Sequence, residues 1–591
     1  MAERGGSTAD GHWPRRLSLR APLANGIRAG MRDGGKRRDR DRDDLIRQDV
    51  LDLHRLGYAQ QLYREMGGFS NFAISFSIIS VLTGAILLFG YGLKLAGPVV
   101  NSVGWPLVSL FTLTVAASMA ELASAYPTAG GLYFWAHRLG GRGWGWTTAW
   151  LNMLGQVTIT AGIDVAAAIY LVGALTRILG IPPDLPLPLV GSLDSWSCSL
   201  IVMVLIMVPQ VLINAFGIRL TARLNDLSVW WHVGGVSLLV LLLGVFGRVH
   251  RPLAFAFSAV STVSPLAASS ATFADGASRP ALSVGSLVLP SPLFALVPGL
   301  AAFYRSAPIA FVFALGLLQA QWTYTGYDAS VHVAEETVLA RLNSAWGVFL
   351  SVAVSAVVGY VMLLALTLAI PDLAATTADP YPVLYIVYAN LGPVPAHLLA
   401  LLIGGAMWLC GLSSITSMSR MWFAFARDGG MPGHRLIRRV HPRWRAPVWA
   451  IVVTSILAVA ICCYSAAYFV VTSISTITLY LAYALPVYLN WRNRRRGTGE
   501  HTGSENTPWT LGRWGATVNL VALVWVGAIT ILFVLPPNEL VLWTMLLVAA
   551  GLFLYWQLLA RHRFTGPTPV DEVELRRLEA AVQSAAAGLR R

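Results

Sequence analysis

Long apolar stretches separated by short polar segments occupy the chain from residue 67 onward. Because a helix needs about 20 apolar residues to cross the hydrocarbon core of a bilayer, this pattern predicts twelve membrane-spanning helices. We expect them at residues 69–91, 99–120, 145–175, 197–216, 227–246, 307–328, 345–370, 396–418, two within 446–491 hinged near Ala466, 516–535 and 539–559. The apolar segment 290–304 is broken by prolines and fits this pattern least well.

The composition strengthens the membrane assignment. Of the 591 residues, 55% are hydrophobic and only 12% are charged, whereas soluble proteins carry roughly 25% charged residues. The net charge of +14 does not indicate a nucleic-acid partner, because the arginines lie in the tails and in alternate short loops without interleaved stacking aromatics. The chain is therefore expected to be an all-α integral membrane protein whose surroundings are the lipid bilayer.

The arginines in the short loops predict the orientation. They follow the second, fourth, sixth, eighth and tenth predicted spans, at Arg138, Arg142, Arg219, Arg223, Arg341, Arg427, Arg435, Arg438, Arg439, Arg443, Arg445, Arg492, Arg494, Arg495 and Arg496. Cytoplasmic loops collect Lys and Arg. We therefore expect both termini in the cytoplasm and a multi-pass protein of the plasma membrane (the inner membrane of the cell).

The predicted spans divide the chain into regions. Residues 1–64, rich in Gly and Arg, are expected to be a disordered cytoplasmic tail. Five spans (65–247), an extended extracellular linker (248–306) and five more spans (307–491) follow, then a cytoplasmic loop (492–515), two last spans (516–560) and a cytoplasmic tail (561–591) whose end has an amphipathic helical pattern. The four cysteines lie in apolar runs without Cys-x-x-Cys spacing, so we expect no metal, cofactor or disulfide framework.

Two of the predicted spans contain features that a simple anchor helix does not need. The first carries a Thr83-Gly84 step, and the sixth loses its helix-forming residues at Tyr324–Tyr327 before a lone acid, Asp328. A broken helix or a carboxylate is tolerated in lipid only where protein or a water-lined cavity receives it. Threonine and glycine are also ordinary residues of membrane helices, but their recurrence in both halves favours two discontinuous helices that line a substrate site.

The ends of broken helices predict the kind of substrate. Freed N–H groups form a positive pole and freed carbonyl groups a negative pole, so a zwitterion suits the gap. Its carboxylate would bind the amides near Thr83, Gly84 and Ala85. Its ammonium group would bind carbonyls near Ser80 and Trp322–Thr323. The aromatic rings of Trp322 and Tyr324 would cover a cationic amine or close over the substrate. The predicted substrate-binding residues are Ser80, Thr83, Gly84, Ala85, Trp322, Thr323, Tyr324, Thr325, Gly326 and Asp328.

Five motifs in order resemble one known superfamily. They are GGFSNFAISFSIISVLTG (67–84), ELASAYPTAGGLYFWA (121–136), LNDLSVWWH (224–232), QWTYTGYDASVHVAEET (321–337) and SSITSMSRMWFAFARDGGMP (413–432). This set is similar to the amino acid–polyamine–organocation superfamily, and more closely to its branch of amino acid, GABA and choline permeases. The resemblance covers residues 56–490 and, more weakly, the last two spans.

The resemblance implies a LeuT-type fold, with two inverted five-helix repeats, discontinuous first and sixth helices, and two further helices. It also implies that Thr83-Gly84 is the loop that binds the substrate carboxylate, that Trp322 is an aromatic gate, and that Asp328 stands where an acid is frequent. Leu82 departs from the Gly-Ser-Gly of many relatives, which leaves the path of this loop and the size of the substrate open.

Three ionisable residues are candidates for coupling transport to protons. Asp328 lies beside the break and would carry a proton, contact an amine or cap the second half-helix. Asp164 lies deep in the third span and His232 inside the fifth, and each would either titrate or be held by structural hydrogen bonds. Glu121 and Glu335-Glu336 are expected at a cytoplasmic gate or in loop packing. Exchange of one substrate for another is the alternative to proton coupling.

Three other functions compete with amino acid transport. A membrane enzyme is not expected, because the sequence has no His-Glu-x-x-His, Gly-x-Ser-x-Gly or P-loop motif. A nutrient receptor that binds without transport is an alternative from another class. A choline or polyamine carrier of the same fold is a closer alternative, although a polyamine would favour more acids than Asp328 and Asp164 supply. The sequence predicts no oligomeric state.

Overall fold

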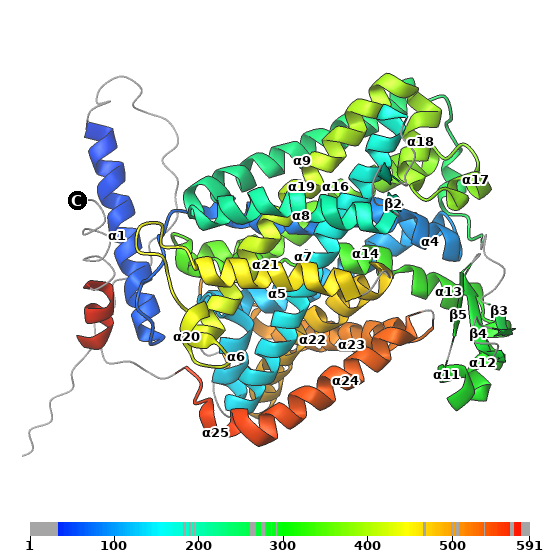
Figure 1. Ribbon diagram of the computed structural model, residues 1–591. Coiled ribbons are helices and arrows are strands. Elements are labelled where there is room, and N and C mark those ends of the chain that lie inside the picture. The colour runs from blue at the N-terminus through cyan, green and yellow to red at the C-terminus, as the bar shows by residue number, and fades with distance from the viewer. Residues whose placement is uncertain are drawn as a thin grey trace, which may run out of the picture.

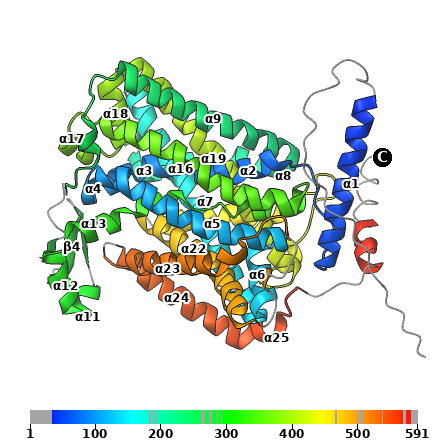
Figure 2. The same ribbon diagram turned by 180° about the vertical axis from the view of Figure 1, so that it is seen from behind.

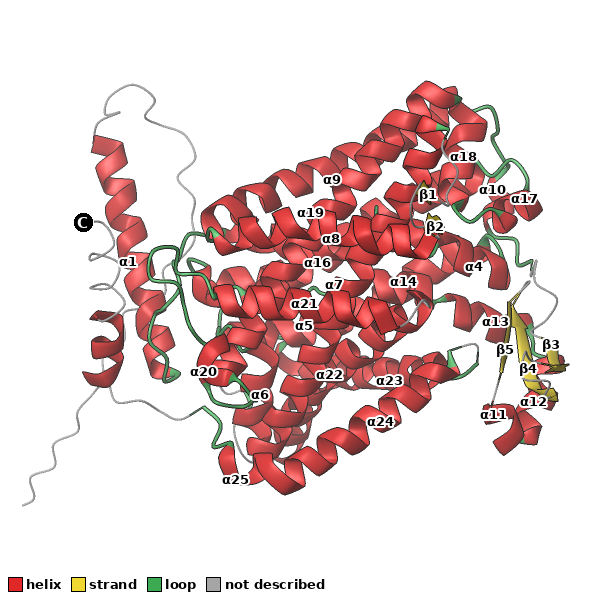
Figure 3. Ribbon diagram, in the orientation of Figure 1, coloured by secondary structure: helices red, strands yellow, loops and turns green. Residues whose placement is uncertain are grey.

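The computed structural model describes residues 33–580 apart from short gaps at 181–184, 188–190, 194, 261–266, 273–277, 285–286, 291, 465–467, 498–500, 503–506, 537 and 568–572. The described chain is a bundle of long helices (Figure 1). Short strands occur only outside the long apolar helices, as the colouring in Figure 3 shows. The hinge expected near Ala466 lies outside the described residues.

The long helices follow the predicted apolar stretches closely. They are α5 (Trp105–Ala125), α7 (Arg142–Leu179), α8 (Ser195–Ala215), α9 (Ile218–Phe246), α16 (Ala340–Leu368), α19 (Pro393–Arg427), α21 (Val448–Tyr464), α22 (Tyr468–Arg496), α23 (Gly515–Phe533) and α24 (Glu539–Tyr555). The first and sixth predicted spans are divided into shorter helices: α2 (Gly68–Ile79), α3 (Gly84–Leu87) and α4 (Phe89–Ala96) in one, and α13 (Ile309–Gly316), α14 (Leu318–Thr323) and α15 (Ala329–His332) in the other.

The other helices are short except for the first, which has 23 residues. They are α1 (Asp33–Arg55), α6 (Gly131–Gly140), α10 (Leu253–Ala256), α11 (Pro292–Leu296), α12 (Pro298–Arg305), α17 (Leu373–Ala378), α18 (Pro382–Leu391), α20 (His434–Ile437) and α25 (Arg561–Arg563), with one-turn segments η1 (Val100–Gly104), η2 (Ala334–Glu336), η4 (Gly512–Trp514) and η5 (Trp556–Ala560). The proline-broken segment 290–304 thus contributes α11 and most of α12, which are both too short to cross a bilayer.

Ten helical segments of the described chain are long and apolar enough to cross a membrane. They match ten of the twelve predicted spans. The other two predicted spans correspond to the shorter apolar helices Ile309–Thr323 and Val448–Cys463, of which the first is shortened by the break that follows it. Ten helices that could cross a membrane agree with the expected multi-span helical membrane protein, and the exact number of twelve stays a prediction.

The helices form a core and a rim. The most apolar part of α7 is 89% buried inside the protein, whereas that of α24 is 11% buried. The helix α7 packs against α19 and α22, whereas α24 lies at the outside of the bundle (Figure 2). Its outward side chains are apolar, with Leu547 74% and Phe553 61% exposed. Apolar groups so exposed suit contact with lipid rather than with water.

The two ends of the bundle differ. At one end, α1 lies beside the C-terminal helical segment 573–580, where the His54 Nε2 atom lies 2.7 Å from Glu579 Oε1. At the other end lie the strands β3 (Ala267–Thr272), β4 (Ser278–Val284) and β5 (Leu287–Pro290), which form an antiparallel sheet in the order β3-β4-β5. A second antiparallel pair joins β1 (Leu185–Leu187) and β2 (Gly191–Leu193). The linker predicted at 248–306 is therefore partly folded.

The tail expected to be disordered up to residue 64 contains α1, so this part of the expectation is wrong. Asp49 accepts hydrogen bonds from the N–H groups of Leu339 (2.7 Å) and Ala340 (3.0 Å), where α16 begins. Arg64 donates to the Thr337 carbonyl at 2.6 Å. A carboxylate at a helix N-terminus is stabilising, and the sequence of a highly charged tail does not reveal such a distant partner.

Candidate functional site

The first broken helix changes direction between Ile79 and Gly84. Ser80 has a φ angle of +25°, outside the range of a right-handed helix. Its carbonyl oxygen accepts hydrogen bonds from the N–H groups of Thr83 (2.8 Å) and Gly84 (3.0 Å), and the regular ladder resumes from Thr83 onward. The predicted interruption at Thr83-Gly84 is thus present, and two of the amides proposed to meet a carboxylate are bonded within the turn.

The second broken helix is interrupted between Thr323 and Ala329. Gly326 has a φ angle of +83°, which favours glycine, and an added Cβ atom would collide with Ile78 of the first broken helix. The Thr325 hydroxyl group donates to the Trp322 carbonyl at 2.6 Å, and the Gly326 N–H group donates to the Tyr483 hydroxyl group at 3.2 Å. Neighbouring side chains thus satisfy backbone groups that the break releases, as a membrane interior requires.

The two breaks touch each other in the bundle. An added Cβ atom at Gly84 would lie 2.5 Å from Thr323 Oγ1 and 2.9 Å from Thr323 Cα, so only glycine permits this approach. A small cavity lies at the junction, lined by Ile78, Ile79, Thr83, Gly84, Ile159, Ile163, Trp322, Thr323 and Thr325. Its volume is about 10 Å³, which is close to the least that holds one water molecule. An amino acid therefore fits only after the breaks move apart.

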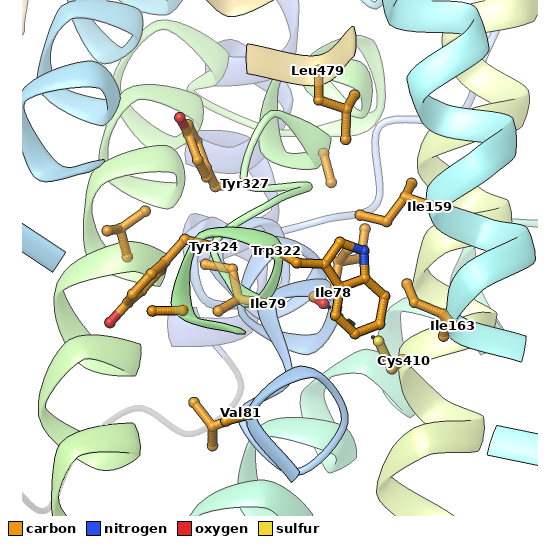
Figure 4. Packing of buried hydrophobic residues seen from close by; sticks show 14 of the residues in the cluster. Ile78, Ile79, Val81, Ile159, Ile163, Trp322, Tyr324, Tyr327, Cys410 and Leu479 are labelled. Atoms are coloured by element: carbon orange, nitrogen blue, oxygen red, sulfur yellow. Dashed lines mark hydrogen bonds between the residues drawn. The ribbon is translucent and has the colours of Figure 1, made fainter. Parts of the chain in front are cut away.

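The aromatic residues of the second break point in different directions. The Trp322 indole lies among Ile78, Ile159 and Ile163 (Figure 4), and its Nε1–H group donates to Ser475 Oγ at 3.2 Å. The Tyr324 ring points away from it, packs 4.8 Å from the Trp105 ring, and shares a 2.7 Å hydrogen bond with Ser109. The two rings expected to cover a substrate together are not brought together. Only Trp322 lines the cavity.

Asp328 lies outside the cavity lining and is fully buried among hydrogen-bond donors. The nearest donors on α7 are the side-chain amides of Asn152 and Gln156, which both lie 3.0 Å from Asp328 Oδ2. The Tyr483 hydroxyl group on α22 donates to Oδ1 at 2.9 Å, and His332 Nε2 lies 3.0 Å from Oδ2. The substrate contact predicted for Asp328 stays a prediction, since the carboxylate faces α7 and α22 in this state.

His232 belongs to a chain of hydroxyl groups that begins at the first break. Its Nδ1 atom lies 2.8 Å from the Ser228 carbonyl oxygen, so Nδ1 carries a hydrogen. Its Nε2 atom lies 2.7 Å from Ser80 Oγ, and Ser80 Oγ lies 2.6 Å from Thr83 Oγ1. The imidazole therefore contacts the predicted substrate loop through two hydroxyl groups.

Asp164 is the third predicted titrating residue. It is fully buried on α7, and its Oδ1 atom accepts a 3.1 Å hydrogen bond from the Gln210 side chain. Its Oδ2 atom has no hydrogen-bond partner among the described residues. It lies against Gly411 of α19, where an added Cβ atom would collide with the carboxylate, and it does not join the Asp328 cluster.

Buried ion pairs close the end of the bundle near α1. They join Glu335 to Arg427 (2.9 Å), Glu336 to Arg420 (3.0 Å) and Glu121 to Arg494 (3.0 Å). Burial opposes ionisation of Glu335, but the Arg427 guanidinium outweighs it and holds the pKa of Glu335 below its ordinary value. These acids, expected at a gate or in loop packing, thus tie η2 to α19 and α5 to α22.

Sequence reasoning missed the partners of Asp328. His332 stands four residues after Asp328, a spacing that places two side chains on the same face of a helix, so this partner had a readable signal. Asn152, Gln156 and Tyr483 are 155 to 176 residues away in the chain and had none. No group of three His, Cys, Asp or Glu side chains that could hold a metal ion occurs in the described ranges.

Comparison with known proteins adds an independent observation. A family model described as amino acid permease matches residues 66–557. The chain is 32% identical over 546 residues to the amino-acid permease BAT1 of Arabidopsis thaliana, covering 87% of this chain and 95% of that protein. It is 27% identical over 407 residues to the GABA-specific permease of Saccharomyces cerevisiae, covering 68% of this chain and 63% of that protein. Both relatives are named as permeases, not as enzymes.

Proposed function

Because this chain belongs to the amino acid permease family, we propose that it carries an amino acid, or a similar zwitterion such as GABA, across the plasma membrane by alternating access. The transport is secondary active, driven by protons or by exchange. The observation that carries the proposal is the contact between two interrupted helices at Gly84 and Thr323. This contact supports a zwitterion site, because the amide end of one half-helix and the carbonyl end of the other would both face the cavity once the breaks move apart.

The cavity lining supports the assignment of roles. Thr83 and Gly84 offer a hydroxyl group and amides to a carboxylate, although the two N–H groups bond to the Ser80 carbonyl in the closed state. A substrate carboxylate that replaces the Ser80 carbonyl oxygen as the acceptor of these N–H groups forms charge-assisted hydrogen bonds, which are stronger than the neutral ones that are lost. Trp322 covers the same space from the second break. The inverted five-helix repeats and the cytoplasmic position of both termini belong to this proposal.

A transport measurement in liposomes tests the proposal. The purified full chain is reconstituted, and uptake of radiolabelled amino acids, GABA, choline and putrescine is followed under a proton gradient, under a sodium gradient and with substrate loaded inside. We expect accumulation of an amino acid or GABA with a proton gradient or by exchange. Uptake that requires sodium and ignores the proton gradient contradicts the coupling, and accumulation of choline or putrescine alone contradicts the substrate class.

The same preparation separates transport from reception. A receptor without transport activity binds its ligand saturably, as a thermal-shift titration reports, but accumulates nothing in the vesicles. Liposomes without protein give the background for both measurements. Binding without accumulation in intact vesicles would therefore overturn the proposal.

A further inference from the structure

The buried pair of Asp328 and His332 is not used by the zwitterion site, because neither side chain lines the cavity. Both side chains are fully buried, and His332 Nε2 lies 3.0 Å from Asp328 Oδ2. The pair spans α15, the short helix that follows the second break: Asp328 is the last residue before α15, and His332 is the last residue of α15. Burying an ionisable pair in a membrane protein costs free energy, so such a pair is by default a candidate functional site.

The hydrogen-bond partners fix the hydrogens of His332. Its Nδ1 atom lies 3.0 Å from the carbonyl oxygen of Ala129. A carbonyl group only accepts, so Nδ1 carries a hydrogen in every charge state that keeps this contact. The remaining question is whether a second hydrogen lies between Nε2 and Asp328.

The surroundings of Asp328 answer this question. Its oxygen atoms lie within 3.0 Å of the Asn152 and Gln156 amide nitrogens and of the Tyr483 hydroxyl group. Tyr483 accepts the Gly326 N–H group, so its own hydrogen is available to the carboxylate. Three neutral donors stabilise the ionised form of the acid. With Asp328 ionised, His332 holds both ring hydrogens and donates from Nε2.

We propose that His332, paired with Asp328, is the binding site of the coupling proton in this transporter, and that the state described here has the proton bound. The inference rests on the proton coupling proposed above and names its site. When the proton leaves Nε2, the lone pair of the ring faces a carboxylate oxygen. The attractive contact then becomes repulsive, so proton release pushes α15 away from its partners.

A second set of contacts carries this change beyond the pair. The backbone of Ala129, in the connection between α5 and α6, is held on both sides: His332 donates to its carbonyl, and Glu335 Oε1 accepts from its N–H group at 3.1 Å. Glu335 in turn holds Arg427 of α19. Displacement of α15 thus loosens the connection between α5 and α6 and the ion pairs that close this end of the bundle.

Other charged groups near the pair are already matched. On the same segment, Glu335 and Glu336 pair with Arg427 and Arg420 of α19. Arg64, before the first broken helix, donates to the carbonyls of Ala334 and Thr337. The Tyr483 hydroxyl group of α22 and the side-chain amides of Asn152 and Gln156 on α7 face Asp328. From α2, Asn71 and Ser75 donate to the backbone carbonyls of Ser330 and Tyr327. Unlike Glu335 and Glu336, the pair of Asp328 and His332 therefore has no arginine partner among the described residues.

The substitution His332→Gln tests the proposal. Glutamine can still donate a hydrogen bond toward Asp328 but holds no titratable proton. The assay uses liposomes given a radiolabelled mixture of protein amino acids and GABA. We expect the variant still to exchange internal for external substrate. Under a proton gradient, however, its internal substrate concentration should rise no higher than the external concentration. Proton entry with substrate, reported by a pH-sensitive dye inside the vesicles, is expected to disappear. His397→Gln, on α19 beside the Tyr388 ring, is the matched control and keeps both.

A second readout does not need transport. The wild-type melting temperature in detergent is expected to fall as the pH is raised, because the state with the proton bound keeps the attractive contact between His332 and Asp328. This slope is expected to become shallower in His332→Gln but not in His397→Gln. A His332→Gln variant that accumulates substrate with the proton gradient, or that keeps the wild-type slope, overturns the proposal. Absence of proton-driven accumulation in the wild type instead overturns the proposed coupling itself.

Discussion

The two helix breaks use the same backbone device but surround it with different chemistry. At the first break, the polar side chains are the hydroxyl groups of Ser80 and Thr83, joined to the single imidazole of His232. At the second, a carboxylate is held by an imidazole, two amides and a tyrosine. The first break therefore offers neutral groups that can change partners when a substrate carboxylate arrives. The second carries buried charge and fixed partners.

This difference separates two tasks that one site must perform. A neutral hydrogen bond has a modest net stability, so the first break can rearrange at small cost. Breaking a buried ion pair leaves a charge uncompensated in a medium of low dielectric constant, so the second break moves only when the charge itself is removed. These contacts support the proposed substrate recognition at the first break and the proposed charge-dependent latch at the second. Substitutions at the two breaks are therefore expected to differ in the size of their effects.

The largest effect is expected for Asp328→Asn. Asparagine carries no negative charge to pair with a protonated His332, and its NH₂ group cannot accept the hydrogen bonds that the second carboxylate oxygen accepts. Breaking this pair should lower the free energy of unfolding by about 3–5 kcal/mol. It should also abolish accumulation of substrate. Thermal unfolding in detergent and liposome uptake measure the two effects. Asp226→Asn, which alters the half-buried acid bonded to Ser70, is the control and should change both only slightly. Wild-type stability in Asp328→Asn would show that the latch carries no charge.

An intermediate effect is expected for Gly84→Ala, which acts where the breaks touch. The added methyl group would lie 2.5 Å from Thr323 Oγ1, and overpacking of this kind costs about 1–3 kcal/mol. We expect loss of substrate binding in a thermal-shift titration with amino acids and GABA. Gly234→Ala, on α9 with no atom within 4 Å of the added Cβ atom, is the matched control. Equal binding by both variants would argue against a substrate site at this junction.

The smallest effect on stability is expected for Ser80→Ala. It removes the hydroxyl group between Thr83 and His232, and a neutral hydrogen bond contributes about 0.5–1.5 kcal/mol. Because Thr83 loses its orienting partner, the apparent affinity for substrate should fall more clearly than the maximal rate. Initial uptake rates over a range of concentrations measure both. Ser199→Ala, a buried serine bonded only to the Ser195 carbonyl in the described chain, is the control. If Ser80→Ala lost as much stability as Asp328→Asn, the expected difference in energy between the two breaks would be contradicted.

Local sequence determined the membrane class and the places where helices break. An apolar stretch of sufficient length predicts a spanning helix wherever it occurs in the chain. Glycine weakens a helix at its own position, as in the Thr83-Gly84 step and at Gly326, whose φ angle is positive. The transporter family was readable for the same reason, since its motifs are continuous segments. The buried state of Asp328 was also foreseeable, because an acid in an apolar stretch must find partners within the protein.

Only the tertiary structure determined which residues are the partners of Asp328. The amides of Asn152 and Gln156 and the hydroxyl group of Tyr483 reach Asp328 from helices far along the chain. The Tyr324 ring packs against Trp105 and points away from Trp322. The charged tail contacts the N-terminus of α16, where Asp49 accepts a hydrogen bond from the Leu339 N–H group. Each of these choices depends on the direction of a side chain between packed helices. Sequence spacing sets that direction only within one helix, as it does for Asp328 and His332.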